Sequence, residues 1–172
     1  HPESVYCSHE KFTRMKHILL LAGLAFSLSA ISQTLYEEGF EGFASGDYIS
    51  GSDVWITWAG GDQTAEDAQV STDVAYEGVN SLHLFAGSAA GGPMDVVLTV
   101  GLNGGVYEAS FWMYIPEGSS GYYNVQEDTA PGVGWAFDAT FAFSGDFQIV
   151  ADEQTVGGGT FPLDTWFEVH HL

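Results

Sequence analysis

The chain has 172 residues, of which 45% are hydrophobic, and it carries 23 acidic residues against only three Lys and Arg. Lys11, Arg14 and Lys16 all precede residue 33, whereas Glu3 and Glu10 are the only acids that do. The rest of the chain therefore lacks the basic footprint that binding to nucleic acid or to an anionic membrane surface requires, and both are excluded as electrostatic partners.

The N-terminal part is typical of an exported protein. Residues 1–14 show neither apolar periodicity nor turn residues, and we interpret them as a non-native or upstream-translated segment. Residues 15–32 have a polar start, an apolar run and small residues before Ser32, which predicts a signal peptide cleaved after that residue. The apolar run is shorter than the roughly 20 residues that span a bilayer, so no membrane insertion is expected after cleavage. Cys7, the single cysteine, lies in the first segment, so the mature chain is expected to have no disulfide.

Residues 33–172 are predicted to form one all-β domain. Short apolar or alternating runs recur between glycine-rich turns such as AGGD, NGG and VGGG, a pattern typical of an antiparallel sandwich or barrel. The predicted strands, in chain order, are 35–40, 54–58, 68–71, 81–86, 95–100, 106–115, 121–126, 135–143, 147–152 and 165–171. No repeat of fixed period is present, which argues against a propeller or a β-helix.

Two of these strands have a clear division between their faces, because successive side chains of a strand point to opposite sides. The predicted core face of the 106–115 strand consists of Tyr107, Ala109, Phe111, Met113 and Ile115. Its opposite face ends in Trp112 and Tyr114, which are either covered by a loop or exposed as a platform. The predicted core face of the 135–143 strand consists of Trp135, Phe137, Ala139, Phe141 and Phe143.

Five segments in chain order resemble a group of secreted bacterial proteins: EDAQVSTDVAYEGVNSLHL, GGPMDVVLTVG, GVYEASFWMYIPEGSSGYYNVQ, PGVGWAF and DTWFEVHHL. Their domain is similar to the concanavalin A-like lectin/glucanase jelly roll in its laminin-G-like form. The resemblance runs from about Leu35 to the C-terminus and implies a two-sheet antiparallel β-sandwich. It also implies further strands after Leu172, so we expect an incomplete domain from a larger secreted protein with other domains.

The hydrolases that share this fold carry two glutamates and an aspartate alternating along one strand. That motif is absent, and the adjacent acidic pairs would point to opposite sides of an extended strand: Glu66-Asp67, Glu127-Asp128 and Asp152-Glu153. A Gly-x-Ser-x-Gly elbow and an HExxH motif are also absent. His83 is predicted to lie on the outer face of its strand. The sequence therefore predicts a protein without catalytic residues and without a zinc site.

Calcium is the expected ion, since it takes carboxylate and carbonyl oxygens from loops. Two loops, 60–69 and 124–132, concentrate such groups, although neither matches an EF-hand. The candidate ligands are Asp62, Glu66, Asp67, Glu127 and Asp128. The resemblance adds that such jelly rolls often carry calcium near the ligand rim. The alternative is that these residues are ordinary solvated acids.

Carbohydrate binding would use aromatic rings that stack on sugars and neighbouring polar groups that bind the hydroxyls. The candidate ligand-binding residues are Trp112, Tyr114, Tyr122, Tyr123 and Asn124. Only one of Tyr122 and Tyr123 can face inward, so the other is the better exposed candidate. Trp135 is in phase with Phe137 and is expected in the core.

The sequence thus predicts a secreted or cell-surface, non-catalytic module for carbohydrate binding or adhesion. Its expected partner is a polysaccharide or a cell-surface glycan. Two alternatives stay open: a structural spacer domain without a ligand, and a partial glycoside hydrolase of the glucanase-like jelly-roll type.

Overall fold

The structure is a computed structural model that describes residues 33–88, 91–102 and 104–172. The predicted segments 1–14 and 15–32 lie outside these residues. The chain divides into two units, His1–Glu37 and Glu38–Leu172, and every element described below belongs to the second. In the described residues the only helical element is a short 3-10 turn, η1 (Ile49–Gly51), and all paired strands are antiparallel, so the β-rich antiparallel prediction is confirmed. None of the described residues forms a helix long and apolar enough to cross a membrane.

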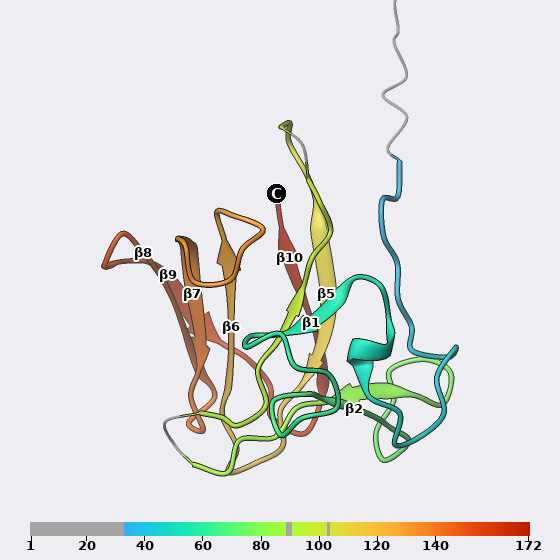
Figure 1. The fold of residues 1–172 in the computed structure, drawn as a ribbon. Coiled ribbons are helices and arrows are strands. Elements are labelled where there is room, and N and C mark those ends of the chain that lie inside the picture. The colour runs from blue at the N-terminus through green and yellow to red at the C-terminus, as the bar shows by residue number, and fades with distance from the viewer. Residues whose placement is uncertain (1–32, 89–90, 103) are drawn as a thin grey trace, which may run out of the picture. The chain divides into compact units, whose positions relative to one another are not determined.

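The strands form four small sheets (Figure 1). The two-stranded sheets are β1 (Trp55–Thr57) with β4 (Val96–Leu98), β2 (Gln69–Ser71) with β3 (Ser81–His83), and β5 (Ala109–Tyr114) with β10 (Trp166–His171). The fourth sheet is a meander of β6 (Gly121–Gln126), β7 (Trp135–Phe141), β8 (Asp146–Ala151) and β9 (Gln154–Thr160).

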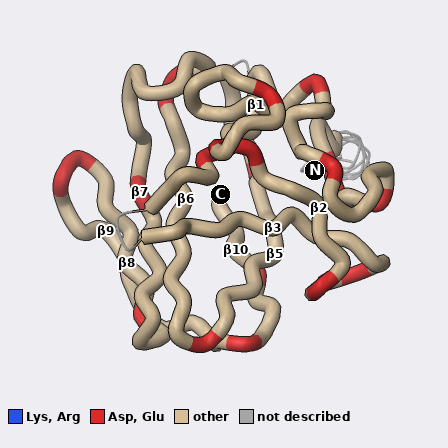
Figure 2. Tube along the Cα trace, turned by 60° about the horizontal axis from the view of Figure 1, so that its bottom comes forward, with Lys and Arg blue, Asp and Glu red and all other residues tan. Residues whose placement is uncertain are grey.

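The main core lies between the β5–β10 pair and the four-stranded sheet. Its buried residues are Ile115, Ala139, Phe141, Phe161 and Val169. Figures 1 and 2 both place β10 beside β6, and the tyrosine and histidine described below join these two strands. Only the C-terminal end of the predicted apolar face of residues 106–115 lies in this core. There Ile115 is buried and Met113 packs against the cluster. At its N-terminal end, β5 starts at Ala109, which is exposed.

Strand β9 was predicted as a turn because it contains the run VGGG. In the structure this run pairs with β8 at the sheet edge. A Cβ atom on Gly158 would lie 2.9 Å from the Phe147 carbonyl oxygen, and one on Gly159 would lie 3.0 Å from Cε1 of the Phe147 ring. The glycines are therefore explained by close approach of a neighbouring strand, which is a known reason for glycine inside a strand.

Two further predictions about strands are wrong. Residues 35–40 form no strand, and Phe40 has a positive φ of 63° with its amide donating to Glu38 Oε1 at 2.6 Å, which turns the chain locally. Phe143 was placed in the core, but β7 ends at Phe141 and Phe143 is 71% exposed. The chain turns there because the Gly145 amide donates to the Ala142 carbonyl at 3.0 Å.

Negative charge is distributed over most loops, and residues 33–172 contain no Lys or Arg (Figure 2). Within the described residues, His170 Nε2 and Glu108 Oε1 form an exposed hydrogen bond of 2.9 Å. His83 is exposed, as predicted. The acids of this domain are therefore compensated by solvent cations and not by internal basic side chains.

His171 differs from the other histidines because it packs against the core side of β6. It shares a 2.8 Å hydrogen bond with the Tyr123 hydroxyl, and its ring lies 5.1 Å from that of Phe137. Burial, and secondarily the charge of His170, lowers the pKa of His171 below its ordinary value of 6.5. The folded state therefore favours neutral His171, whereas the unfolded chain takes up a proton at an ordinary pKa.

This pKa difference gives a testable pH dependence. Between the ordinary pKa and the lower folded pKa only the unfolded state binds the proton, so the His171 contribution reduces stability as pH falls from about 6.5. We expect the melting temperature of wild type to decline more steeply with acidification than that of His171→Gln. Thermal unfolding at fixed ionic strength measures this, with His83→Gln as the exposed-histidine control. Identical pH slopes for wild type and His171→Gln would contradict the assignment.

Candidate functional site

The outer face of the β6–β7 pair carries a polar network. Asn124 and Asp138 face each other across the two strands, and Tyr122 lies two residues before Asn124 on the same face. The Tyr122 hydroxyl donates to Asp138 Oδ1, and Asn124 Nδ2 donates to the Tyr122 hydroxyl oxygen at 3.0 Å. Tyr122 is 56% exposed, so the network is accessible from solvent.

The surroundings of this network are acidic. Burial raises the pKa of Tyr122, the hydrogen bond to Asp138 raises it further, and the charge of Asp95 adds in the same direction, against a lowering hydrogen bond from Asn124. The pKa of Asp95 is itself raised, first by burial and then by the charge of Glu66. Tyr122 therefore keeps its proton and remains a hydrogen-bond donor near neutral pH.

Next to this network lies a pocket of about 230 Å³. It is lined by Trp135, Phe137, Asp138, Val150, Ala151, Asp152 and Glu153. Asp152 and Glu153 both have a positive φ, 48° and 59°, in the turn between β8 and β9. In an extended strand these two carboxylates would point to opposite sides, whereas the turn places both at one pocket.

Trp135 was predicted to lie in the core, and that prediction is wrong. The register of β6 and β7 shifts between Val125 and Gln126, so that Val125 pairs with Phe137 and Gln126 pairs with Trp135. This irregularity breaks the two-residue alternation between Phe137 and Trp135. The Trp135 ring stacks on that of Trp58, with centroids 6.3 Å apart, and remains 43% exposed beside the pocket.

The five predicted ligand-binding residues do not form one site. Tyr122 and Asn124 belong to the polar network. Tyr123 lies on the opposite face of β6, packed against the core, with its ring 5.1 Å from that of Phe111. Trp112 and Tyr114 lie on the outer face of β5, where the ring of Tyr76 stacks on Trp112 at 3.9 Å.

The predicted calcium ligands are also dispersed over several local contacts. The Glu66 carboxylate accepts the Ala59 amide at 3.0 Å, and Asp128 Oδ1 accepts the Ala130 amide at 3.0 Å. Asp62 and Glu127 are exposed. In the described part of the chain, no group of three or more His, Cys, Asp and Glu side chains lies close enough to hold a metal ion.

Asp67 is buried and holds two backbone segments together. Its carboxylate accepts the Ser50 amide at 3.3 Å, the Ser50 hydroxyl, and the Gln63 amide at 2.9 Å. These donors fix the 3-10 turn against the 60–67 loop, because a buried carboxylate must have its oxygens satisfied.

We therefore expect Asp67→Asn to lower the free energy of unfolding by about 1.5–3 kcal/mol, because an amide cannot accept from all three donors. Urea unfolding in EDTA measures the loss. The matched control is Asp62→Asn, the same substitution at an exposed residue. If Asp67→Asn were as stable as wild type in EDTA and differed only with added calcium, Asp67 would act as a metal ligand instead.

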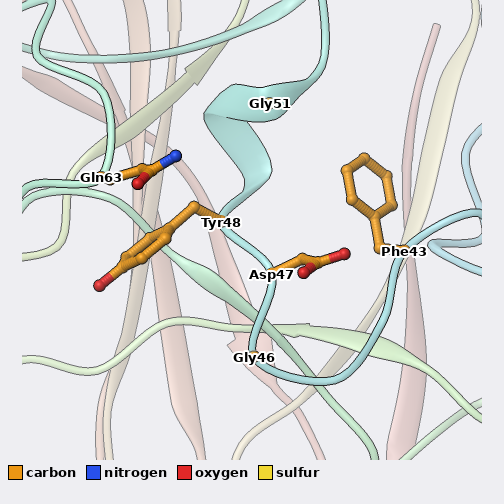
Figure 3. Close-up of a pocket in the computed structure, with 6 residues that line it drawn as sticks. All are labelled: Phe43, Gly46, Asp47, Tyr48, Gly51 and Gln63. Atoms are coloured by element: carbon orange, nitrogen blue, oxygen red, sulfur yellow. The ribbon is translucent and has the colours of Figure 1, made fainter.

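A second pocket, of about 410 Å³, lies at the 43–51 segment (Figure 3). In this view the Phe43 ring and the Asp47 carboxylate lie on one side, and Tyr48 and Gln63 point to the other. The Asp47 carboxylate accepts the Ala44 amide at 2.8 Å, so it serves the local turn. This pocket has no tryptophan, and its one carboxylate serves the local turn, so it is a weaker candidate than the pocket beside Trp135, which combines an exposed indole with three acids.

Sequence reasoning thus missed the pocket carboxylates, Trp135 and Tyr76. The alternating pattern of residues 135–143 gave no sign of the register shift, whereas the adjacent acids at 152–153 could have signalled a turn.

No family model, no curated protein and no solved structure matches the chain.

Proposed function

We propose that the chain is an exported, non-catalytic module that binds a polysaccharide or a cell-surface glycan, and that its fold is a concanavalin A-like jelly roll. One observation supports the binding role: an exposed indole, Trp135, and the carboxylate of Asp138 line the same pocket. At about 230 Å³, this pocket is smaller than the about 300–1,000 Å³ typical of sites for drug-sized ligands. It suits a single sugar ring.

The chemistry of the pocket matches that of a sugar. The flat face of an indole packs against the C–H groups of a pyranose ring, which stabilises binding by apolar contact. Carboxylates accept hydrogen bonds from sugar hydroxyls, and such charge-assisted bonds are roughly twice as strong as neutral ones. Residues 33–172 contain no Lys or Arg to pair with Asp138, Asp152 or Glu153. Because Asp138 Oδ1 already accepts the Tyr122 hydroxyl, a sugar would bind Asp138 through its second carboxylate oxygen.

The same charges restrict the class of glycan. A uronate-rich or sulfated polysaccharide would bring anionic groups toward Asp138 and its acidic neighbours, and like charges at short range repel. The proposed ligand is therefore an uncharged glycan.

A glycan array probed with the full chain, with and without calcium, tests the proposal. We expect binding to uncharged glycans, no binding to uronate-rich or sulfated ones, and no release of reducing ends from a bound ligand. The calcium arm separates a metal-dependent site from one that needs only the pocket residues. If no glycan binds in either condition, the chain is better described as a structural spacer.

A further inference from the structure

The outer face of the β5–β10 pair carries four aromatic rings, Tyr76, Trp112, Tyr114 and Trp166, which we call the aromatic surface. The Tyr76 ring stacks on Trp112 with centroids 3.9 Å apart and planes inclined by 13°. Trp166 lies 6.0 Å from Tyr76 and 5.6 Å from Tyr114. Tyr76, a loop residue, therefore covers one face of the Trp112 ring.

The loop that carries Tyr76 is fixed at its C-terminal end. The Glu41 carboxylate accepts the amides of Val79 and Asn80, both at 2.9 Å. The buried Asn80 amide group donates to the carbonyls of Phe40 and Phe43. Gly78 has a φ of 63°, and a Cβ atom there would collide with the Glu41 carboxylate, so this position favours glycine. Tyr76 is therefore presented on an anchored loop.

Two of the four rings are exposed, whereas Tyr114 and Trp166 are half-buried. Tyr76 is 45% exposed and Trp112 is 40% exposed. Because Tyr76 rests on Trp112 with one face, its other face is the one that can receive a ligand. Polar groups adjoin the rings on the same strand faces: Glu168 pairs with Trp112, and His170 pairs with Ser110 and binds Glu108. Flat rings bordered by hydrogen-bonding groups match both the C–H faces and the hydroxyl groups of a sugar.

Charge restricts the partner of this surface. A second copy of the chain would bring the same excess of acids, which opposes self-association, and polyanions are repelled for the same reason. The surface also lies on the opposite side of β5 from the core face of Met113 and Ile115, so it is separate from the pocket on the β6–β8 face.

We propose that the aromatic surface is a second carbohydrate-binding surface, which stacks rings of an uncharged glycan chain on Tyr76 and Trp166. This surface is distinct from the pocket beside Trp135, and binding to it does not require that pocket. With both surfaces, one domain contacts two segments of a polysaccharide, and the second contact gains from the high local concentration that the first creates.

The indole N–H signals of the full chain distinguish the two surfaces in one NMR titration. The probe is a panel of uncharged hexasaccharides built from glucose, mannose, xylose or N-acetylglucosamine, with polygalacturonate as the anionic comparison. We expect the Trp112 and Trp166 signals to move on saturation, in wild type and equally in Trp135→Ala. Movement of Trp135 alone would overturn this proposal and leave the pocket intact. No movement of any indole would overturn both.

Substitutions on the loop give the second test. We expect Tyr76→Ala to weaken the binding reported by Trp112 and Trp166 by about tenfold, because a stacked ring is lost. Tyr76→Phe keeps the ring and should bind as wild type does. Phe85→Ala removes an exposed ring outside both sites and is the control. Equal affinities of Tyr76→Ala and wild type at these signals would overturn the assignment.

Discussion

Replacing Phe141 with alanine is expected to lower the free energy of unfolding by about 3–5 kcal/mol. Phe141 is only 5% exposed and occupies the centre of the aromatic core, with its ring 5.2 Å from that of Phe161, 5.7 Å from Phe167 and 5.9 Å from Phe147. Truncation removes the apolar contacts and leaves a cavity between two sheets. Domains have a stability of about 5–15 kcal/mol, so the loss is a large part of the total.

The neighbouring exposed residue provides the control. Phe143 lies two positions further on, beyond the end of β7, and Phe143→Ala is expected to change stability by no more than about 0.5 kcal/mol. Chemical denaturation monitored by tryptophan fluorescence measures both variants of the full chain. Comparable losses at the two positions would show that the core does not lie where the structure has it.

Replacing Trp135 with alanine is expected to weaken glycan binding by about tenfold or more, because a large aromatic side chain at the centre of a site carries much of the binding energy. Asp138→Asn keeps the shape of the carboxylate but removes its charge, and we expect a smaller loss of about fivefold. Isothermal titration with a glycan identified on the array measures both affinities.

Thermal unfolding of each variant shows whether a loss of binding reflects a loss of fold. Phe85→Ala is the matched control, since it removes an aromatic ring of comparable exposure away from the pocket. If Trp135→Ala bound the glycan as wild type does, Trp135 would be an ordinary partner of Trp58 and not a ligand-binding residue.

The sequence was most informative where local pattern and final packing agree. The predicted strand 121–126 is β6 with the same bounds, because glycine-rich turns delimit it and its side chains alternate. Alternation also predicted that Phe137, Ala139 and Phe141 share one face, and Ala139 and Phe141 are buried in the core. Phe137 contacts the rings of Tyr123 and His171 at the edge of this core. In β7 the buried residues Ala139 and Phe141 are two positions apart, so the period of the sequence is the period of the structure.

Prediction failed where tertiary contacts override local pattern. Three successive glycines weaken an isolated strand, but in β9 they are required because the neighbouring strand approaches Gly158 and Gly159 closely. The position of Trp135 depends on a register shift in the pairing of β6 with β7, and a shift between two strands leaves no mark within either one. Pairing partners and their irregularities are properties of the assembled sheet.

The candidate site could be predicted only in part for the same reason. Tyr122 and Tyr123 were both candidates because only one of two adjacent tyrosines can face the core, and the sequence did not show which; Asn124 was a candidate as a neighbouring polar group. Asp138 was not among the predicted site residues, since it belongs to the next strand and faces Asn124 only in the assembled sheet. Tyr76 lies 36 positions before Trp112, and the contact depends on an anchoring bond from Glu41, so composition and spacing alone could not bring these rings together.

The central claim is that an uncharged glycan binds in the pocket beside Trp135. A crystal structure of the full chain with the glycan selected on the array tests it most directly. We expect one sugar ring stacked on the Trp135 indole, with hydroxyl groups donating to Asp138 and to the carboxylates of Asp152 and Glu153. A sugar bound only elsewhere on the domain, with the pocket free of it, would contradict the claim.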